Sequence, residues 1–352
     1  MNDMATVIIP ARESAAVIGR CLTSLMRSTC AGSLQILVAD MGSDDGTEAA
    51  VRAFPGVRFF RTGGNTGRCH ALNCGLHLVR TPYAVILSPY VTVGRHCIER
   101  LCAALEKKPY AFCAQPVVCR GQGGQKTYTA GTCLPVWGRP YPKRAIRGGA
   151  AQIFAPEAEA AAYRMEALEE TGIFDERFYA GLEEVDLAYR AAFSGFTAAV
   201  VHDAFARSDA PAGRTPFCES VETGNLLYML YKNMPGPQRT LNEPFLRAGL
   251  RDRKRRLSAS GREELWDAAL ERGQDLCMDA EYGSMRQEDG LDPEKLPLPE
   301  TFGMKVKDAG VEEIYPLFVG ARTVYGFRDI GAALRIQRAF WRDSILYFRD
   351  RR

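Results

Sequence analysis

The sequence lacks any apolar run long enough to cross a lipid bilayer. A spanning helix needs roughly 18 consecutive apolar residues, and the longest candidates, around Tyr83–Leu87 and Leu226–Tyr231, have the size of core segments. The N-terminus, Met1–Ala5, leads directly into Val7-Ile8-Ile9 without the basic segment or cleavage site of a secretory signal. These absences predict a cytoplasmic chain without a transmembrane helix.

Paired cysteines are also lacking. The chain has 11 cysteines and no Cys-x-x-Cys pair, and an odd number of cysteines without a signal peptide predicts reduced thiols in the cytosol. Cys21 and Cys102 fall on the apolar faces of predicted helices, where a free thiol acts as a small hydrophobic side chain. We therefore expect these cysteines to have no catalytic role.

The sequence also lacks a large excess of positive or negative residues. The formal net charge of +3 over 352 residues does not favour nucleic acid as a partner. Hydrophobic residues make up 46% of the chain and charged residues 25%, as in an average soluble protein. The length predicts one large domain with an appended segment.

The first 120 residues alternate short β-branched runs with amphipathic helical patterns, which predicts an α/β fold with a parallel sheet. Ligands bind beyond the carboxyl ends of such strands. We therefore expect the four loops after the strands to form one crevice. The predicted strands are Val7–Ile9, Ile36–Ala39, Val57–Phe60 and Tyr83–Leu87, and the loops are Pro10–Glu13, Asp40–Asp45, Gly63–Gly67 and Ser88–Tyr90.

Beyond residue 120 the patterns predict a loop from Gly121 to Gly149 that carries four basic residues, followed by mixed elements and then helices. A nucleotide-sugar-binding domain is expected over residues 1–213 and a helical region over residues 214–352. The basic residues are Arg139, Lys143, Arg144 and Arg147; the predicted strands are Ala150–Phe154 and Thr197–Val201, the latter ending at His202; the predicted helices are Tyr163–Thr171, Leu182–Phe193, Cys218–Asn233, Arg251–Glu271 and Ile330–Phe348; and a proline-containing strap is expected over Gln287–Glu300.

Four segments, in this order and spacing, resemble the family 2 glycosyltransferases, especially their bacterial rhamnosyltransferase-like members. The segments are Val7-Ile8-Ile9-Pro10-Ala11-Arg12-Glu13; Val38 to Thr47 with its Asp40-Met41-Gly42-Ser43; Asn65-Thr66-Gly67 with Ala71, Asn73 and Gly75; and Gly172-Ile173-Phe174-Asp175-Glu176 followed by Glu183-Glu184-Val185-Asp186-Leu187 and Arg190. The likeness covers about the first two thirds of the chain, and it rests on the order of the motifs because no single one is specific.

The resemblance implies a GT-A fold, a nucleoside diphosphate sugar donor, a saccharide, lipid-linked or protein acceptor, and inversion at the anomeric carbon. Such a transfer needs a carboxylate to accept the proton of the acceptor hydroxyl. Glu184 stands at the position of the family's base, with Glu183 as the alternative and Asp186 in the same catalytic block. The candidate nucleotide-sugar-binding residues are Pro10, Arg12, Glu13, Asp40, Ser43, Asn65, Gly67, Asn73, Ser88, Tyr90, Arg144 and Arg147.

Two of these assignments have plain structural alternatives. Asp40 can accept the imide N–H of uracil or thymine, which predicts a UDP- or dTDP-linked donor, or it can simply cap the next helix. Arg12 and Glu13 can flank the base and ribose, or they can form an ordinary helix start.

One motif of the family is missing. Ser88-Pro89-Tyr90 occupies the place of the Asp-x-Asp that holds the metal ion, and neutral hydroxyls are poor ligands for Mg²⁺ or Mn²⁺. His202 is a candidate ligand for a metal or phosphate, or a structural residue. The chain is therefore either an active, metal-independent transferase that uses fixed cations from Arg139–Arg147, or an inactive pseudo-glycosyltransferase that binds nucleotide or acts as a scaffold.

The C-terminal helices allow two interpretations. The basic run Arg251–Arg256 and the helix from Ile330 can rest on an anionic membrane and bring the site to a lipid-linked acceptor. Alternatively, their apolar faces pack inside the protein or form a homodimer surface. Asp329, Asp343 and Asp350 interrupt the basic face of the last helix, which favours packing.

Overall fold

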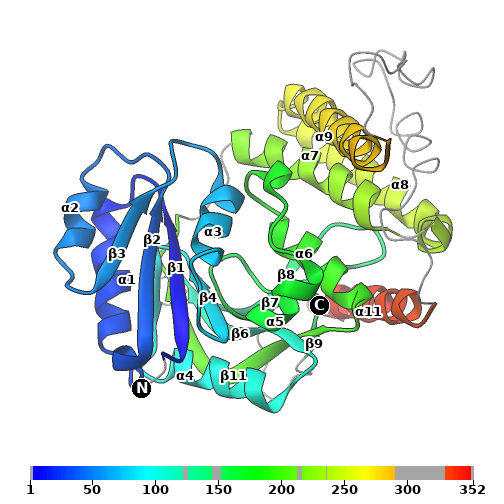
Figure 1. Cartoon of the computed structure of the whole chain (residues 1–352). Coiled ribbons are helices and arrows are strands. Elements are labelled where there is room, and N and C mark those ends of the chain that lie inside the picture. The colour runs from blue at the N-terminus through cyan, green and yellow to red at the C-terminus, as the bar shows by residue number, and fades with distance from the viewer. Residues whose placement is uncertain are drawn as a thin grey trace. The chain divides into compact units, whose positions relative to one another are not determined.

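A computed structural model describes residues 3–121, 126–144, 152–211, 216–234, 236–289 and 330–349. The chain divides into two compact units (Figure 1). The first comprises Met1–Cys133, Pro140–Ala212 and Phe348–Arg352, and the second comprises Leu134–Arg139 and Gly213–Tyr347. The short segment Leu134–Arg139 thus belongs to the helical unit although it lies within the sequence of the sheet.

The first unit begins with four parallel strands in the order β3-β2-β1-β4, as the alternation of apolar runs predicted. Their register pairs Ala11 with Asp40 and Asp40 with Arg61, so the ends of β1, β2 and β3 lie level with one another. The elements are β1 Ala5–Ala11, α1 Ala15–Met26, η1 Ala31–Ser33, β2 Leu34–Asp40, α2 Thr47–Arg52, β3 Val57–Arg61, α3 Arg68–Leu76, β4 Tyr83–Leu87, β5 Val91–Val93 and α4 Cys97–Lys107.

The second half of the sheet mixes strand directions, and the sequence predicted it poorly. Strand β10 runs antiparallel between β4 and β6, while β11 runs parallel to β6. The elements are β6 Ala111–Arg120, β7 Thr127–Cys133, β8 Tyr141–Arg144, β9 Gln152–Ile153, β10 Ala160–Arg164, α5 Met165–Thr171, η2 Glu176–Phe178, α6 Glu183–Phe193 and β11 Thr197–Ser208. Among the described residues, 11 strands join this sheet.

Three predictions in this region were wrong. The expected loop from Gly121 to Gly149 contains two strands, β7 and β8. Strand β7 pairs with β6, and β8 pairs with β7. The helix expected from Tyr163 begins at Met165, because Ala160–Arg164 pairs with strands on both sides. The strand expected to end at His202 continues to Ser208 through a bulge between Val201 and Phe205.

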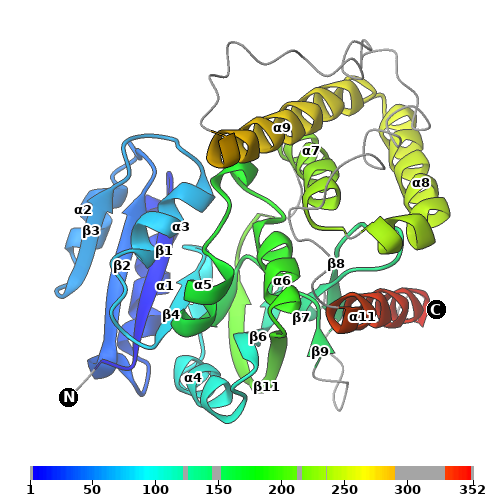
Figure 2. The same ribbon diagram turned by 45° about the vertical axis from the view of Figure 1, so that its right-hand side comes forward.

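Helices cover both faces of the sheet (Figure 2). On one face, α1 and α4 bury their apolar stripes, including Cys21 and Cys102, against side chains such as Val7 and Ile9. On the opposite face, α3 approaches β1 so closely that a Cβ on Gly75 would lie 2.6 Å from Ile8 Cγ2. The predicted apolar role of the two cysteines is confirmed, and burial raises the pKa of each thiol to about 12.

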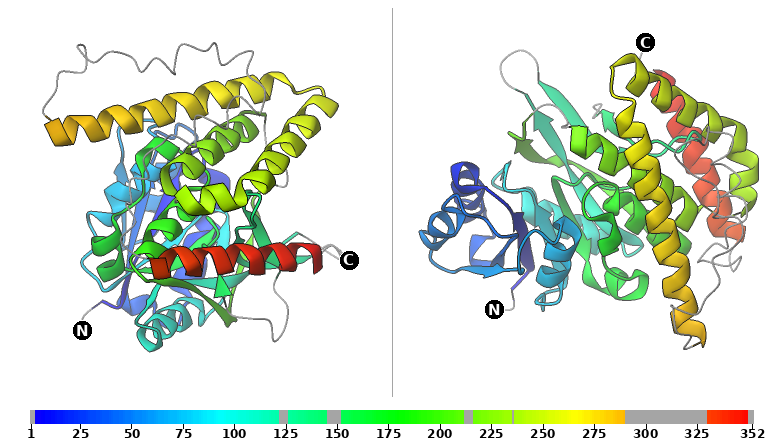
Figure 3. Two further views of the ribbon diagram at one scale, coloured as in Figure 1. Left: turned by 90° about the vertical axis from the view of Figure 1, so that its right-hand side faces the viewer. Right: turned by 90° about the horizontal axis from the view of Figure 1, so that it is seen from above.

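The second unit is helical (Figure 3). It contains α7 Pro216–Asn233, α8 Gly236–Ala259, α9 Glu264–Asp289 and α11 Ile330–Arg349. The prediction of a single helix over Arg251–Glu271 was wrong, since α8 ends at Ala259 and α9 begins at Glu264. Of the expected strap Gln287–Glu300, the first residues belong to α9 and the remainder lies outside the described residues.

The close approach of α3 to β1 makes Gly75 a test of the packing. Gly75→Ala should lower the free energy of unfolding by about 1–3 kcal/mol, because the added methyl group overpacks Ile8. The matched control is Gly19→Ala in α1, where a Cβ meets nothing within 4 Å and should raise stability by roughly 0.5–1 kcal/mol. Urea unfolding of both variants measures the two effects; equal stability of the two would contradict the packing described.

Candidate nucleotide-sugar site

Asp40 organises the loop that follows β2. Its carboxylate is fully buried, accepts hydrogen bonds from the Ser43 hydroxyl at 2.5 Å and the Ser43 N–H at 3.0 Å, and lies 3.7 Å from Arg61 Nε. Ser43 Oγ in turn accepts a hydrogen bond from the N–H of Glu13 at 2.9 Å. The loops after β1 and β2 are therefore joined through Ser43, with Glu13 held at a strained φ of 45°.

Asp40 does not cap helix α2. The residue at that N-cap is Gly46, at φ 91°, without a side-chain hydrogen bond. Asp45 supplies the local contacts instead, accepting from the N–H of Thr47 at 3.0 Å and of Ala15 at 2.9 Å. The hydrogen bond from the Thr47 hydroxyl lowers the pKa of Asp45. The capping alternative for Asp40 thus fails, whereas its contact with a nucleotide base stays a prediction.

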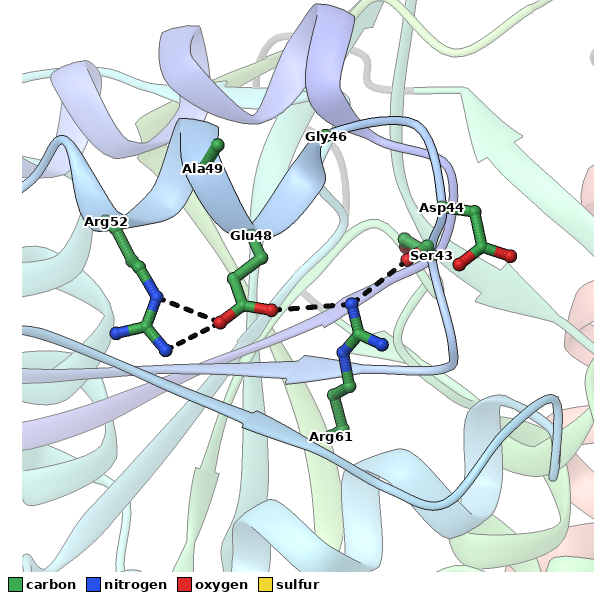
Figure 4. Close-up of a pocket in the computed structure, with 7 residues that line it drawn as sticks. All are labelled: Ser43, Asp44, Gly46, Glu48, Ala49, Arg52 and Arg61. Carbon is green, nitrogen blue, oxygen red and sulfur yellow. Dashed lines mark hydrogen bonds and ion pairs between the residues drawn. The ribbon is translucent and has the colours of Figure 1, made fainter.

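A hollow of 430 Å³ opens beside this loop (Figure 4). Arg61 lies across it, 3.4 Å from Glu48 Oε2, and donates to the Ser43 carbonyl at 3.3 Å. The hollow is lined by Ser43, Asp44, Gly46, Glu48, Ala49, Arg52 and Arg61. Arg61 was not among the predicted site residues, and it ends the observed strand β3, one residue beyond the predicted strand Val57–Phe60. It provides a half-exposed cation at the nucleotide loops.

Arg68 joins two buried glutamates at the start of helix α6. It donates from Nη1 to Glu183 Oε1 and, at 2.6 Å, to Glu184 Oε1, while Nη2 donates to the Ala158 carbonyl at 2.8 Å. Glu183 is 1% exposed and Glu184 5% exposed. Among the described residues, Glu183 Oε2 is a buried atom without a hydrogen-bond partner. The two candidate bases therefore share one guanidinium, and Arg68 was not among the predicted site residues.

The surroundings of Glu184 favour its protonated form. Burial is the main cause, the neighbouring Glu183 adds to it, and Arg68 opposes it, so that the pKa of Glu184 rises to about 7. A carboxylate with such a pKa can take up a proton near neutral pH, which is the property required of a general base.

The turn before α6 is strained and closely packed. Tyr179 and Leu182 have positive φ values of 60° and 71°, and the Tyr179 hydroxyl donates to Asn65 Oδ1 at 2.7 Å. Gly67 has no room for a side chain, since a Cβ would lie 2.6 Å from the Tyr179 ring. The predicted residues Asn65 and Gly67 thus fit against the turn that carries Glu183 and Glu184.

Two other predicted site residues make buried structural contacts. Asn73 donates to the Phe174 carbonyl and to Glu176 Oε1, both at 2.9 Å. Asp186 is fully buried in an ion pair of 3.0 Å with Arg190, whose guanidinium also binds the carbonyls of residues 171–173. Both hold the Gly172–Phe178 turn in place, so their geometry is that of positioning residues.

The end of β4 is linked to the carboxylates through one short segment. The Ser88 N–H donates to the Glu159 carbonyl at 2.8 Å, and the neighbouring Ala158 carbonyl binds Arg68. Tyr90 lies beside the end of β11, where its carbonyl accepts from the N–H of Asp209 at 3.0 Å. Ser88, Glu159, Arg68 and Glu184 therefore form a connected row along the carboxyl edge of the sheet.

Arg120 is a cation at this edge that the sequence did not predict. It ends β6, donates to Glu159 Oε1 at 3.0 Å and forms an ion pair with Glu157. Thr129 also binds Glu157, at 3.0 Å. The Arg120 side chain is 28% exposed. Burial raises the pKa of Glu157.

The remaining candidates lie elsewhere or outside the described residues. His202 is exposed at the bulge of β11, six positions before the strand ends at Ser208, next to the ion pair of Arg100 and Asp203. Arg144 is exposed at the end of β8, and Arg147 lies outside the described residues. Pro10 is buried within β1, whereas Arg12 is exposed directly after it.

The residues present do not fit a metal ion at the Asp-x-Asp position. Ser88 and Tyr90 offer neutral oxygens only, and in the part of the chain that the structure describes no three His, Cys, Asp or Glu side chains are arranged to hold a metal. The extension of β11 also removes His202 from the strand end at which we expected it to serve as a ligand.

Comparison with known proteins identifies the domain that carries this site. The model of the family described as "Glycosyl transferase family 2" matches residues 6–172, from β1 through α5. These residues are therefore similar to glycosyltransferase family 2. The match includes the nucleotide loops and ends directly before the turn that leads to Glu183 and Glu184.

A curated relative matches more of the chain. It is the N-acetylglucosaminyl-diphospho-decaprenol L-rhamnosyltransferase of Mycobacterium tuberculosis, which is 26% identical over 242 residues, or 58% of this chain and 75% of that protein. This agrees with the rhamnosyltransferase-like resemblance of the motifs.

Solved structures confirm the predicted GT-A fold. S. aureus TarS 1–349 in complex with UDP-GlcNAc matches with a TM-score of 0.52 at 14% identity, covering 78% of this chain and 80% of that chain. GalNAc-T7 with UDP, GalNAc and Mn²⁺ matches with a TM-score of 0.52 at 15% identity, covering 64% of this chain and 48% of that one. The chain thus spans about half the length of the GalNAc-T7 structure.

The raised pKa of Glu184 has a consequence for stability. Because the folded protein prefers the protonated form, the contribution of this group is fully present below about pH 4.5 and is lost as the pH rises through about 7. The free energy of unfolding of Glu184→Gln relative to wild type should therefore increase between roughly pH 5 and pH 8. Urea unfolding at both pH values measures it. Glu166→Gln, on an exposed carboxylate, is the control, and an equal pH dependence of the two variants would contradict the assignment.

Proposed function

We propose that this chain is an inverting glycosyltransferase that moves a sugar from a UDP- or dTDP-linked donor to a saccharide, lipid-linked or protein acceptor. The observation that carries the proposal is the buried pair Glu183 and Glu184, held by Arg68 beside the row that leads to Ser88. A lipid-linked acceptor agrees with the decaprenol named in the mycobacterial relative.

In the proposed reaction, Glu184 accepts the proton of the acceptor hydroxyl as that oxygen attacks the anomeric carbon. The bond from this carbon to the diphosphate breaks on the opposite face, which inverts the configuration. Arg68 fixes the orientation of the carboxylate through its 2.6 Å hydrogen bond. Burial, with a smaller contribution from the like charge of Glu183, raises the pKa of Glu184 to about 7, so the proposed base operates near neutral pH.

The donor nucleotide is proposed to bind at the joined loops after β1 and β2. Arg12 and Glu13 then flank the base and ribose. For Asp40 to accept an imide N–H, one carboxylate oxygen must exchange its hydrogen bond from Ser43 for one from the base, because the carboxylate is fully buried. Arg61 supplies positive charge at the same loops.

Departure of the diphosphate is proposed to need no metal ion, since Ser88 and Tyr90 are poor ligands. Fixed positive groups can stabilise the charge that develops on a leaving group. Arg120, beside Glu159 and partly exposed, is one described cation at this edge; Arg144 and Arg147 remain candidates on the basis of the sequence.

The competing function is a pseudo-glycosyltransferase that binds a nucleotide or acts as a scaffold without transferring sugar. The replacement of Asp-x-Asp by Ser88-Pro89-Tyr90 favours it. The retained carboxylates with Arg68 favour the enzyme. Two buried glutamates that share one cation lower the stability of the fold, and a scaffold without transfer activity has no use for such an arrangement.

Nucleotide binding tests the first step of the proposal. We expect UDP or dTDP to bind the purified protein equally well with Mn²⁺ and with excess EDTA, and binding to be lost in Asp40→Ala, as measured by calorimetry. Glu166→Ala, which changes an exposed carboxylate, should bind like the wild type. If neither nucleotide binds under any condition, the chain is a scaffold with the shape of a transferase.

Replacement of the base tests the reaction itself. Glu184→Gln should lower kcat at least about 100-fold, the usual contribution of a general base, while the Kd of the nucleotide stays unchanged. Wild-type activity should rise with pH through about 7, since Glu184 must be ionised to accept the proton. Transfer from a labelled donor measures both effects. A loss in Glu183→Gln with full activity in Glu184→Gln would assign the base to Glu183 instead.

A further inference from the structure

Helix α11 has apolar side chains on two opposite faces. On the inner face, Ile336 and Phe340 are buried, and Asp343 accepts a hydrogen bond from the N–H of Leu134 at 2.8 Å. On the outer face, Leu334, Trp341 and Ile345 are 54%, 43% and 68% exposed. Their spacing of seven and four residues places these three on one side of the helix. Burial within the unit therefore accounts for only one of the two apolar faces of α11.

Helix α8 extends this exposed face. The two helices run side by side and parallel, because Gln238 donates to the Ala333 carbonyl at 2.6 Å and Asn242 exchanges two hydrogen bonds of 3.1 Å with Gln337. Further along, Phe245 meets Trp341 edge to face at 5.5 Å. Both Leu241 and Phe245 are exposed. We call Leu241, Phe245, Leu334, Trp341 and Ile345 the α8–α11 face.

Positive charge surrounds the α8–α11 face. Helix α8 contains seven basic and two acidic residues, and α11 contains four and one. Each acid is matched by an arginine: Glu243 pairs with Arg247, Asp252 with Arg256, and the buried Asp343 with Arg342. The exposed basic residues include Arg251, Arg255, Arg335 and Arg338.

The burial of Asp343 corrects an expectation from the sequence. We expected Asp343 to interrupt the basic face of the last helix, but it is fully buried and bonded to the backbone of Leu134. Asp329 and Asp350, the other expected interruptions, lie outside the described residues. The exposed side of α11 thus combines apolar and cationic side chains.

We propose that the α8–α11 face is a docking surface for an anionic lipid bilayer. Apolar side chains including a tryptophan, flanked by arginines on the same helices, match the interfacial zone, where acyl chains meet phosphate groups. No helix among the described residues is long and apolar enough to span a membrane, and docking needs none. The excess of basic over acidic residues selects a negatively charged bilayer over a neutral one or a neutral protein partner.

Vesicle binding of the full chain, without donor or acceptor, tests the proposal separately from sugar transfer. The protein should co-sediment with phosphatidylcholine vesicles that contain phosphatidylglycerol, bind pure phosphatidylcholine weakly, and lose affinity at high salt. Trp341 emission should shift to the blue on binding, because Trp266 is buried and Trp137 is half-buried. The double variant Trp341→Glu, Ile345→Glu should partition at least about tenfold more weakly.

Matched variants separate docking from misfolding. Trp341→Phe should keep vesicle binding and lose the blue shift, and Tyr110→Glu, at a 74% exposed aromatic in the first unit, should bind like the wild type. Thermal unfolding of each variant reports its folding. The proposal is overturned if the wild type does not bind anionic vesicles, or if the double variant binds as well as the wild type. A wild-type dimer that the double variant converts to a monomer, without vesicle binding, would instead assign the face to a second copy.

Discussion

The guanidinium of Arg68 holds two carboxylates that would otherwise repel each other inside the protein. It binds Glu183, Glu184 and the carbonyl of Ala158, and so connects the start of α3, the start of α6 and the segment before β10. Removing one partner from such a buried cluster typically costs about 3–5 kcal/mol. Arg190 and Asn73 hold the segment before the strained turn, and Gly67 packs against Tyr179 within it. These contacts position the start of α6, where the proposed base lies.

The parallel half of the fold was predictable because its signals are local. Strands β1 and β4 are buried on both faces and appear as continuous apolar runs, and the stripe of Ile18, Cys21, Leu22 and Leu25 marks the helix between β1 and β2. The mixed half was not predictable in the same way. Ala160–Ala162 has helical propensity, yet β4 and β6 on either side make it a strand. Pairing with neighbouring strands overrides the local preference there, and the hydrophobic pattern of the sequence does not indicate such pairing.

The same distinction applies to the site. Motif order indicated the loops at Asp40, Asn65 and Glu183. It did not indicate the three arginines of the candidate site, Arg61, Arg68 and Arg120. Arg68 contacts glutamates more than 100 positions away in the sequence, and Arg120 contacts Glu157, 37 positions away. Spacing along the chain does not reveal such pairs. The one available signal was the position of Arg68 directly after Asn65-Thr66-Gly67, at the start of the helix that follows this motif. Asn73 and Asp186, in turn, belong to the motifs because they hold the turn.

In the proposed reaction, the absence of Asp-x-Asp removes more positive charge from the side of the departing diphosphate than a single arginine can supply. A divalent cation brings two positive charges, whereas Arg120 brings one and already shares it with Glu157 and Glu159. Burial raises the pKa of Glu157, the closer of these two carboxylates to the interior. The base side is complete by comparison, with a carboxylate whose pKa lies near neutrality and a cation that orients it. In the proposed reaction, the described residues therefore provide more for deprotonation of the acceptor than for stabilisation of the departing diphosphate.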